Sequence, residues 1–141
     1  MAWTELIGAA ESIDALADTS VFVAAEQGRS LAADCLPSLL GISVVTLAEL
    51  RLAVLNAPSP NIVALRLATL EKALTVQAVG IDERIAACWA LLRSAARSES
   101  QSHVNDLWIA ATALSLQVPV VTQDEGFLRL KKVSDLEVIL I

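Results

Sequence analysis

Residues 103–127 read HVNDLWIAATALSLQVPVVTQDEGF, and this stretch decides the fold that the rest of the chain completes. Its apolar residues recur at the spacing of a helix that lays one face on a sheet: Leu107, Ala111, Leu114 and Val118. Pro119 cannot continue that helix, so residues 118–122 are expected to form a short strand. Asp106 stands in the first turn of the helix, and Asp124 follows the strand. In a parallel α/β sheet these two positions lie at the edge where ligands bind.

Short apolar runs and longer helical patterns alternate through the remainder of the chain. Further strands are expected at residues 12–17, 41–45, 76–81 and 137–141, and the clearest further helices at 46–56, 61–74 and 82–97. This alternation predicts an α/β fold with helices on both faces of a central, mostly parallel sheet. A chain of 141 residues has the size of one domain. We therefore expect an extension at residues 1–11 and a single domain at 12–141.

The composition is apolar without predicting a membrane protein. Hydrophobic residues make up 55% of the chain, and the mean hydropathy is +0.61. The longest uncharged run, residues 107–123, contains Pro, Gln, Ser and Thr and is too short to span a bilayer. The first residues carry acids where a signal peptide needs Lys or Arg. We expect a cytoplasmic protein, with no membrane span, whose surplus apolar surface a partner or a second copy covers.

Charge and metal-ligand content narrow the chemistry. The formal net charge is −6, from 10 basic and 16 acidic residues, which disfavours tight binding of nucleic acid. Four of the acids are expected to lie close together in the fold. Without these four, the chain would have 10 basic and 12 acidic residues. Cations bound to such a cluster would cancel most of the imbalance. With a single histidine, His103, and no CxxC spacing, a zinc site is not expected.

Four acidic residues stand at helix starts or strand ends, and each alone has an ordinary structural role. Asp18 follows the first strand and can cap the next helix. Thr46 and Glu49 have the spacing of a capping box. Asp106 favours the positive end of its helix dipole, and Asp124 can cap the short helix that follows it. Taken one at a time, these structural roles are the favoured interpretation.

Taken together, the four acids favour a metal site. A parallel α/β order sends Asp18, Asp106 and Asp124 to one edge of the sheet, and Glu49 lies one helical turn beyond another strand. Two like charges 4 Å apart repel by about 4 kcal/mol at an effective dielectric near 20, so the cluster needs compensation. A hard divalent cation is the natural partner, because Mg²⁺ and Mn²⁺ select carboxylate and water oxygens.

The same residues form a series of motifs that resembles a known family. The motifs are DTS at residues 18–20, TLAEL at 46–50, NDLWIAA at 105–111 and VTQD at 121–124. In this order they resemble the motifs of PIN-domain ribonucleases, and they are most similar to the VapC toxins of bacterial type II toxin–antitoxin pairs. The resemblance implies a PIN-like α/β/α sandwich and a Mg²⁺- or Mn²⁺-dependent endoribonuclease. It also implies an RNA substrate, a cognate VapB-type antitoxin and a homodimer.

Carried over motif by motif, the resemblance also implies roles for individual residues. The catalytic acids would be Asp18, Glu49, Asp106 and Asp124. The three aspartates would hold the metal directly or through water, and Glu49 would orient or deprotonate the attacking water. The supporting positions around them would be Ser20, Asn105 and Thr122. One departure from the family pattern is the serine-rich loop at residues 98–102, where related chains often have glycine.

Two other functions fit parts of the pattern. A phosphoryl-accepting receiver domain also gathers acids at a sheet edge, but it needs an acidic pair after its first strand, where Asp18 stands alone. A PIN-like domain that only binds a partner would have lost catalytic acids, whereas all four are present.

The helices predicted at residues 46–56 and 61–74 are apolar over more than one face. That surface suits an internal position, or a groove that takes an antitoxin helix. The sequence leaves this choice open.

Overall fold

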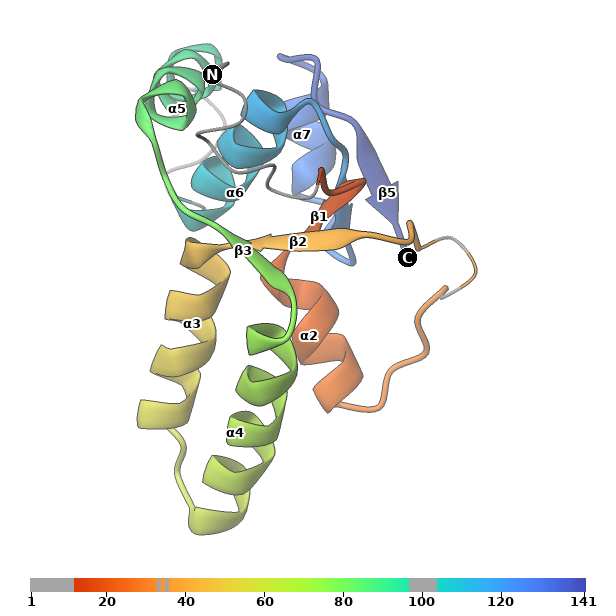
Figure 1. The fold of residues 1–141 in the computed structure, drawn as a ribbon, viewed down its shortest axis with the longest axis vertical. Helices are drawn as coiled ribbons and strands as arrows, with labels where there is room; N and C mark the ends of the chain where they lie inside the picture. Colours follow the sequence, from red (N-terminus) through yellow and green to blue (C-terminus); the bar gives the residue numbers. More distant parts are fainter. Residues whose placement is uncertain (1–11, 33, 35, 97–103) are drawn as a thin grey trace, which may run out of the picture.

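The computed structural model describes residues 12–32, 34, 36–96 and 104–141, so the predicted extension at 1–11 and the serine-rich loop lie outside it. Within these residues the strands are β1 (Ala15–Ala17), β2 (Leu40–Ser43), β3 (Gln77–Val79), β4 (Val120–Thr122) and β5 (Val138–Leu140). The helices are α2 (Thr19–Glu26), α3 (Val44–Leu55), α4 (Pro60–Leu74), α5 (Glu83–Ala95), α6 (Val104–Leu116) and α7 (Phe127–Lys131). The strands form one sheet in the order β3-β2-β1-β4-β5, with every described pairing parallel (Figure 1). The predicted α/β class is confirmed, and the described sheet is wholly rather than mostly parallel.

Alternation along the strands separates two apolar cores, one on each face of the sheet. Leu16 and Val120 belong to the core that α5, α6 and α7 complete. Their neighbours Ala17 and Val121 belong to the core formed with α2, α3 and α4. Successive side chains of a strand point to opposite faces, so each buried strand supplies both cores. Figure 1 shows the two groups of helices on opposite sides of the sheet, which gives three layers.

The start of α3 differs from the sequence prediction. We expected a strand through residue 45 and a helix from Thr46, whereas β2 ends at Ser43 and α3 begins at Val44. Ser43 caps the helix, because its Oγ accepts a hydrogen bond from the backbone N of Val45 at 3.1 Å. The capping box predicted for Thr46 and Glu49 is therefore wrong. Both residues lie inside the helix, and Thr46 is fully buried.

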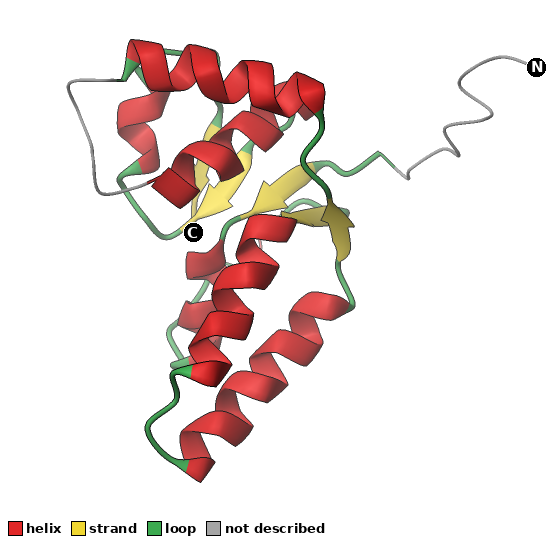
Figure 2. Cartoon of the chain, turned by 90° about the vertical axis from the view of Figure 1, so that its left-hand side faces the viewer, coloured by secondary structure: helices red, strands yellow, loops and turns green. Residues whose placement is uncertain are grey.

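Helices α3 and α4 form a long hairpin that projects away from the sheet (Figure 2). Ser59 caps α4 by accepting from the backbone N of Ile62 at 3.3 Å, and Pro60 occupies the first turn, where its missing N–H costs nothing. Arg66 Nη1 donates to the backbone O of Ala53 at 2.6 Å and so ties the two helices together. The hairpin is thereby a defined structural unit rather than a loose extension.

The apolar surplus of the chain lies on helix surfaces. Leu55 of α3 is 81% exposed, and Leu91 of α5 is 73% exposed. No helix in the described ranges is both long and apolar enough to cross a membrane. Where such exposed side chains form a contiguous apolar patch, the patch is typical of a surface that meets another protein.

Candidate active site

The carboxyl ends of β1 and β4 are joined by one serine. Asp18 follows β1, and Ser20 Oγ donates to Asp18 Oδ1 at 2.6 Å. The same Ser20 oxygen lies 3.2 Å from Thr122 Oγ1 at the end of β4 and accepts from the backbone N of Gln123 at 2.9 Å. Residues separated by about a hundred positions in the chain are thus fixed around one carboxylate. These contacts place Ser20 and Thr122 beside Asp18.

Asp18 is a buried carboxyl group whose ionisation is disfavoured. Its side chain is only 3% exposed. Burial raises the pKa of Asp18 from 3.8 to about 6, the hydroxyl groups of Ser20 and Thr122 lower it, and the charge of Asp106 raises it again. Asp18 occupies the N-cap position of α2, as the sequence suggested, but it makes no side-chain cap hydrogen bond there. The hydrogen bond that its carboxylate accepts from α2 comes from the Ser20 hydroxyl group. A carboxylate held in this way is stabilised by a cation brought next to it.

Asp106 lies in the first turn of α6, close enough to Asp18 for its negative charge to raise the pKa of that carboxyl. Two acids that are 88 positions apart in the sequence therefore interact at this edge of the sheet. The neighbouring Asn105 is exposed at the helix start. Its predicted supporting role stays a prediction. The single histidine of the chain, His103, lies outside the described residues.

Glu49 is held at the same edge by Thr19, a residue for which the sequence predicts no role of its own. Thr19 Oγ1 donates a hydrogen bond to Glu49 Oε1 at 2.7 Å. Thr19 Oγ1 also lies 3.1 Å from Oγ1 of the buried Thr46. Thr19 is the residue directly after Asp18, so this contact connects α3 to the first turn of α2. The only sequence signal for Thr19 is its place as the middle residue of the DTS motif. Its hydrogen bond to Glu49 cannot be predicted from the motif, because the bond forms only when α2 and α3 pack together.

Asp124 has a structural contact in addition to its place at the strand end. Its backbone N donates to Thr122 Oγ1 at 2.8 Å, and its Oδ1 accepts from the backbone N of Gly126 at 2.8 Å. The carboxylate thus closes a tight turn before α7, which resembles the capping role suggested by the sequence. A side chain at Gly126 would place Cβ 3.0 Å from Asp124 Oδ1, so this glycine leaves room for the acid.

The donor set suits a hard divalent ion, although the described residues form no preassembled three-ligand cluster. Among them, no group of three Asp, Glu, His or Cys side chains is arranged to hold a metal ion. Mg²⁺ does not require such a cage, since proteins commonly bind it through one or two carboxylates and retain several waters. The interacting pair of Asp18 and Asp106 meets that need. The structural observation that supports the fit is the burial of the Asp18 carboxylate next to the charge of Asp106.

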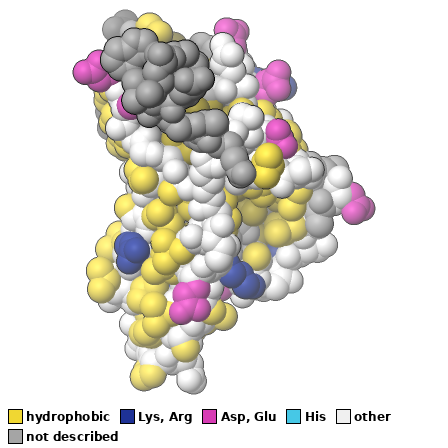
Figure 3. Space-filling model, viewed as in Figure 1, with side chains coloured by type: hydrophobic (Ala, Val, Ile, Leu, Met, Phe, Trp, Pro, Cys, Tyr) yellow, Lys and Arg dark blue, Asp and Glu magenta, His cyan; other side chains and the backbone are white. Residues whose placement is uncertain are grey.

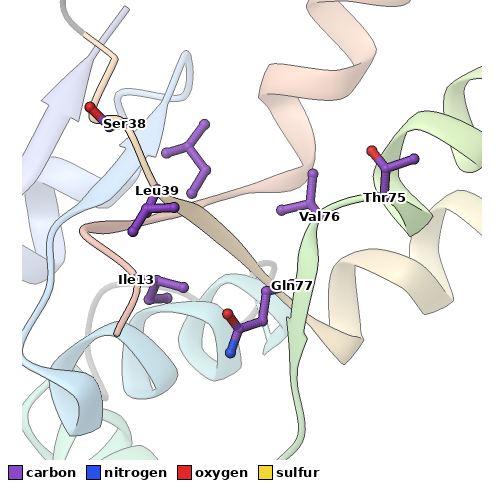
Figure 4. Close-up of a pocket in the computed structure, with 7 residues that line it drawn as sticks. Ile13, Ser38, Leu39, Thr75, Val76 and Gln77 are labelled. Carbon is purple, nitrogen blue, oxygen red and sulfur yellow. The ribbon is translucent and has the colours of Figure 1, made fainter. Parts of the chain in front are cut away.

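A separate hollow of about 480 Å³ lies away from this edge. It is lined by Ile13, Ser38, Leu39, Leu40, Thr75, Val76 and Gln77 (Figure 4). Leu40 and Gln77 begin β2 and β3, so the hollow sits at the amino ends of the strands, opposite the acids. Its lining has no acidic, basic or histidine side chain. The acidic side chains that suit a metal ion therefore lie at the opposite edge of the sheet from this hollow.

Comparison with known proteins agrees with the fold and with the order of the motifs. The PIN domain family model matches residues 15–133. Ribonuclease VapC5 of Mycobacterium tuberculosis is 46% identical over 123 residues, which cover 86% of this chain and 91% of that protein. Ribonuclease VapC4 of the same organism is 43% identical over 128 residues, or 90% and 96% of the two chains.

Solved structures give the same result. The crystal structure of VapBC-5 from Mycobacterium tuberculosis matches with a TM-score of 0.81 and 41% identity, over 91% of this chain and 99% of that one. The structure of FitAcB from Neisseria gonorrhoeae matches with a TM-score of 0.68 and 28% identity, over 89% and 96%.

The chain belongs to the PIN domain family. Within it, the chain groups with the VapC ribonuclease toxins of type II toxin–antitoxin systems. The family and its fold confirm the resemblance drawn from the four motifs. They also set aside the receiver-domain alternative.

Proposed function

We propose that this VapC-type toxin hydrolyses RNA phosphodiesters with Mg²⁺ or Mn²⁺ held at the carboxyl edge of the sheet. The main support for the proposal is the buried Asp18 carboxylate. Burial and the charge of Asp106 both disfavour its ionised form, and a bound cation would stabilise that form. Asp18 and Asp106 would hold the ion, and Asp124 would reach it directly or through water. When bound, the ion supplies a water of lowered pKa and a positive charge beside the scissile phosphate.

The remaining residues would orient these groups. Ser20 donates a hydrogen bond to Asp18 and lies within hydrogen-bond distance of Thr122. The two hydroxyl groups would therefore orient the buried carboxylate before an ion binds. Glu49 comes from a different helix and would orient the attacking water or take its proton. Such preorganisation matters because reacting groups must be held in a near-attack geometry. Asn105 is proposed to support the same edge from the start of α6.

Removing divalent ions is expected to stop cleavage. A fluorescently labelled pool of single-stranded RNA with a randomised central segment should be cut by the purified chain in Mg²⁺ or Mn²⁺. Excess EDTA should reduce the rate by at least about 10³-fold, because the activated water and the charge next to the phosphate are both lost. Adding back Mn²⁺ should restore the rate, whereas Ca²⁺ at equal concentration serves as a control for charge alone. Cleavage that is unchanged in EDTA would contradict the proposal, and no cleavage under any condition would favour a PIN-like domain that only binds.

The α3–α4 hairpin is proposed as the docking surface for a VapB-type antitoxin. Its exposed leucines are Leu52, Leu55, Leu65, Leu67 and Leu74. Figure 3 shows hydrophobic side chains gathered along these two helices. The related structures named VapBC-5 and FitAcB support the pairing of such a toxin with a second protein. An amphipathic helix laid on the hairpin would bury side chains that the rest of this chain leaves in water.

Replacing Leu55 by Glu is expected to release the toxin from its antitoxin without changing RNA cleavage. A leucine that becomes buried contributes roughly 1.5–3 kcal/mol, so a charge in its place should weaken binding by at least about tenfold. Binding of the co-expressed antitoxin would be measured by isothermal titration, and cleavage with the labelled RNA pool. Leu91→Glu, which makes the same change on α5 across the sheet, is the matched control. Equal antitoxin binding by the wild-type chain and Leu55→Glu would place the docking surface elsewhere.

The homodimer implied by family resemblance is also part of the proposal. Exposed leucines remain on both layers of helices, which provides apolar surface for a second copy as well as for an antitoxin. Light scattering of the toxin alone measures its mass directly. A monomer at micromolar concentration would remove this element of the proposal and leave the catalytic assignment untouched.

A further inference from the structure

We infer that Thr19 is a positioning residue that holds the Glu49 carboxylate over the acidic edge of the sheet. The inference rests on the proposed function, in which Glu49 serves the attacking water. The observation behind it is the 2.7 Å hydrogen bond from Thr19 Oγ1 to Glu49 Oε1, which joins side chains 30 positions apart in the chain.

The geometry suits a positioning role because Thr19 is itself held firmly. It is the first residue of α2, immediately after Asp18, and its branched side chain has few rotamers. Its hydroxyl oxygen also lies 3.1 Å from Oγ1 of Thr46, which is fully buried one turn before Glu49 on α3. The hydroxyl is thus fixed between two residues of the neighbouring helix.

Glu49 needs this support more than the aspartates do. A glutamate has three rotatable side-chain bonds, so its carboxylate samples many positions unless a partner selects one. A hydroxyl donor selects the conformer in which the carboxylate lies next to the residue that follows Asp18. The contact therefore sets the spacing between Asp18 and Glu49, which the backbone alone does not fix.

The chain offers a matched control for this contact. Thr69 Oγ1 donates to Glu26 Oε1 at 2.8 Å and joins α4 to α2 away from the acidic edge. Thr69 is buried, with 7% of its surface exposed. If a Thr–Glu bond between helices acts only as a structural link, Thr19→Val and Thr69→Val should behave alike.

The kinetic test compares Thr19→Val, Thr19→Ser and Thr69→Val on the labelled RNA pool. Thr19→Val is expected to lower kcat by roughly 10- to 100-fold with KM within about threefold, because a misplaced group slows the chemical step rather than binding. Thr19→Ser keeps the hydroxyl and should stay within about threefold of wild type. Thr69→Val should keep its kcat within about twofold. Thr19→Ala gives the same test if the valine packs badly.

A double-mutant cycle with Glu49→Ala separates this inference from the proposed function. Thr19→Val should cost little further activity once Glu49 is gone, because its effect passes through that carboxylate. Urea unfolding in EDTA gives a readout that needs no metal and no RNA, and there the two changes should be less than additive. Full activity in Glu49→Ala would overturn the proposed role of Glu49. A large loss in Glu49→Ala with wild-type kcat in Thr19→Val, or additive effects in both cycles, would overturn the inference about Thr19 alone.

Discussion

Asp18→Asn is expected to make the metal-free protein more stable at pH 7.5 while reducing RNA cleavage by on the order of 10³-fold. The stability gain follows from the ionisation of Asp18. Its pKa is raised from 3.8 to about 6, chiefly by burial, so the folded state at neutral pH bears the cost of a charged carboxylate. A shift of this size corresponds to about 3 kcal/mol, and Asn avoids it while its side-chain oxygen can still accept from Ser20. Part of the gain will be offset by imperfect packing, so an increase of about 1–3 kcal/mol is expected.

The pH dependence of folding stability provides a control for the stability effect predicted for Asp18→Asn. Because the folded pKa of Asp18 lies above the unfolded value, the folded state binds the extra proton between pH 4 and 6. The contribution of Asp18 to stability is therefore most favourable below the unfolded pKa and is lost as pH rises through about 6. The advantage of Asp18→Asn in EDTA should be large at pH 7.5 and should shrink towards pH 4. Urea unfolding at each pH measures it.

Asp14→Asn is the matched control for that series. Asp14 precedes the same strand, is exposed, and accepts a hydrogen bond from the backbone N of Leu39 at 3.2 Å. Its substitution should leave both cleavage and the pH profile of stability close to those of wild type. If Asp18→Asn is instead less stable than wild type at pH 7.5 in EDTA, the charged carboxylate stabilises the metal-free fold through its contacts. That result would contradict the prediction that Asp18 requires a cation.

Asp106→Asn is the second large effect. Removing one of two proposed carboxylate ligands should lower cleavage by on the order of 10³-fold in Mg²⁺. The same change removes a negative charge that raises the pKa of Asp18, so that pKa should fall. In cells, expression of the wild-type toxin should arrest growth, and Asp106→Asn should relieve the arrest at equal protein level. Asp135→Asn, an exposed acid after α7, is the control.

Both readouts of Asp106→Asn have to agree. Growth that recovers only because the variant fails to accumulate would be seen as a loss of protein on an immunoblot. Metal-dependent cleavage at the wild-type rate by Asp106→Asn would exclude this residue from the catalytic set. An unchanged titration of the Asp18 carboxyl, followed by NMR, would show that the two acids do not interact in solution.

The sequence predicted the architecture because periodicity and strand-end acids are local signals. Alternating short strands and helices require parallel pairing, and β1 and β4 then bring their following residues to one edge. The stretch at residues 103–127 identified both a helix-start acid and a strand-end acid without any knowledge of tertiary contacts. The family resemblance supplied roles for those residues, and the structure supplied the serine that links Asp18 to the end of β4.

Other features required the three-dimensional fold. The cap of α3 was misplaced because Ser43 and Thr46 are both good cap formers, and only the strand boundary decides between them. The contact between Thr19 and Glu49 exists only because α2 and α3 pack together. The raised pKa of Asp18 depends chiefly on its burial in the folded chain. Pattern arguments identify which residues meet, whereas hydrogen-bond partners and desolvation follow from packing.

The most direct test of the acidic edge is a crystal of the wild-type chain soaked in Mn²⁺, with an anomalous difference map collected at the manganese edge. We expect a peak within coordination distance of the carboxylates of Asp18 and Asp106, and we expect this peak to be lost in Asp18→Asn. A peak elsewhere on the molecule, or none at a Mn²⁺ concentration that supports cleavage, would contradict the proposed metal site.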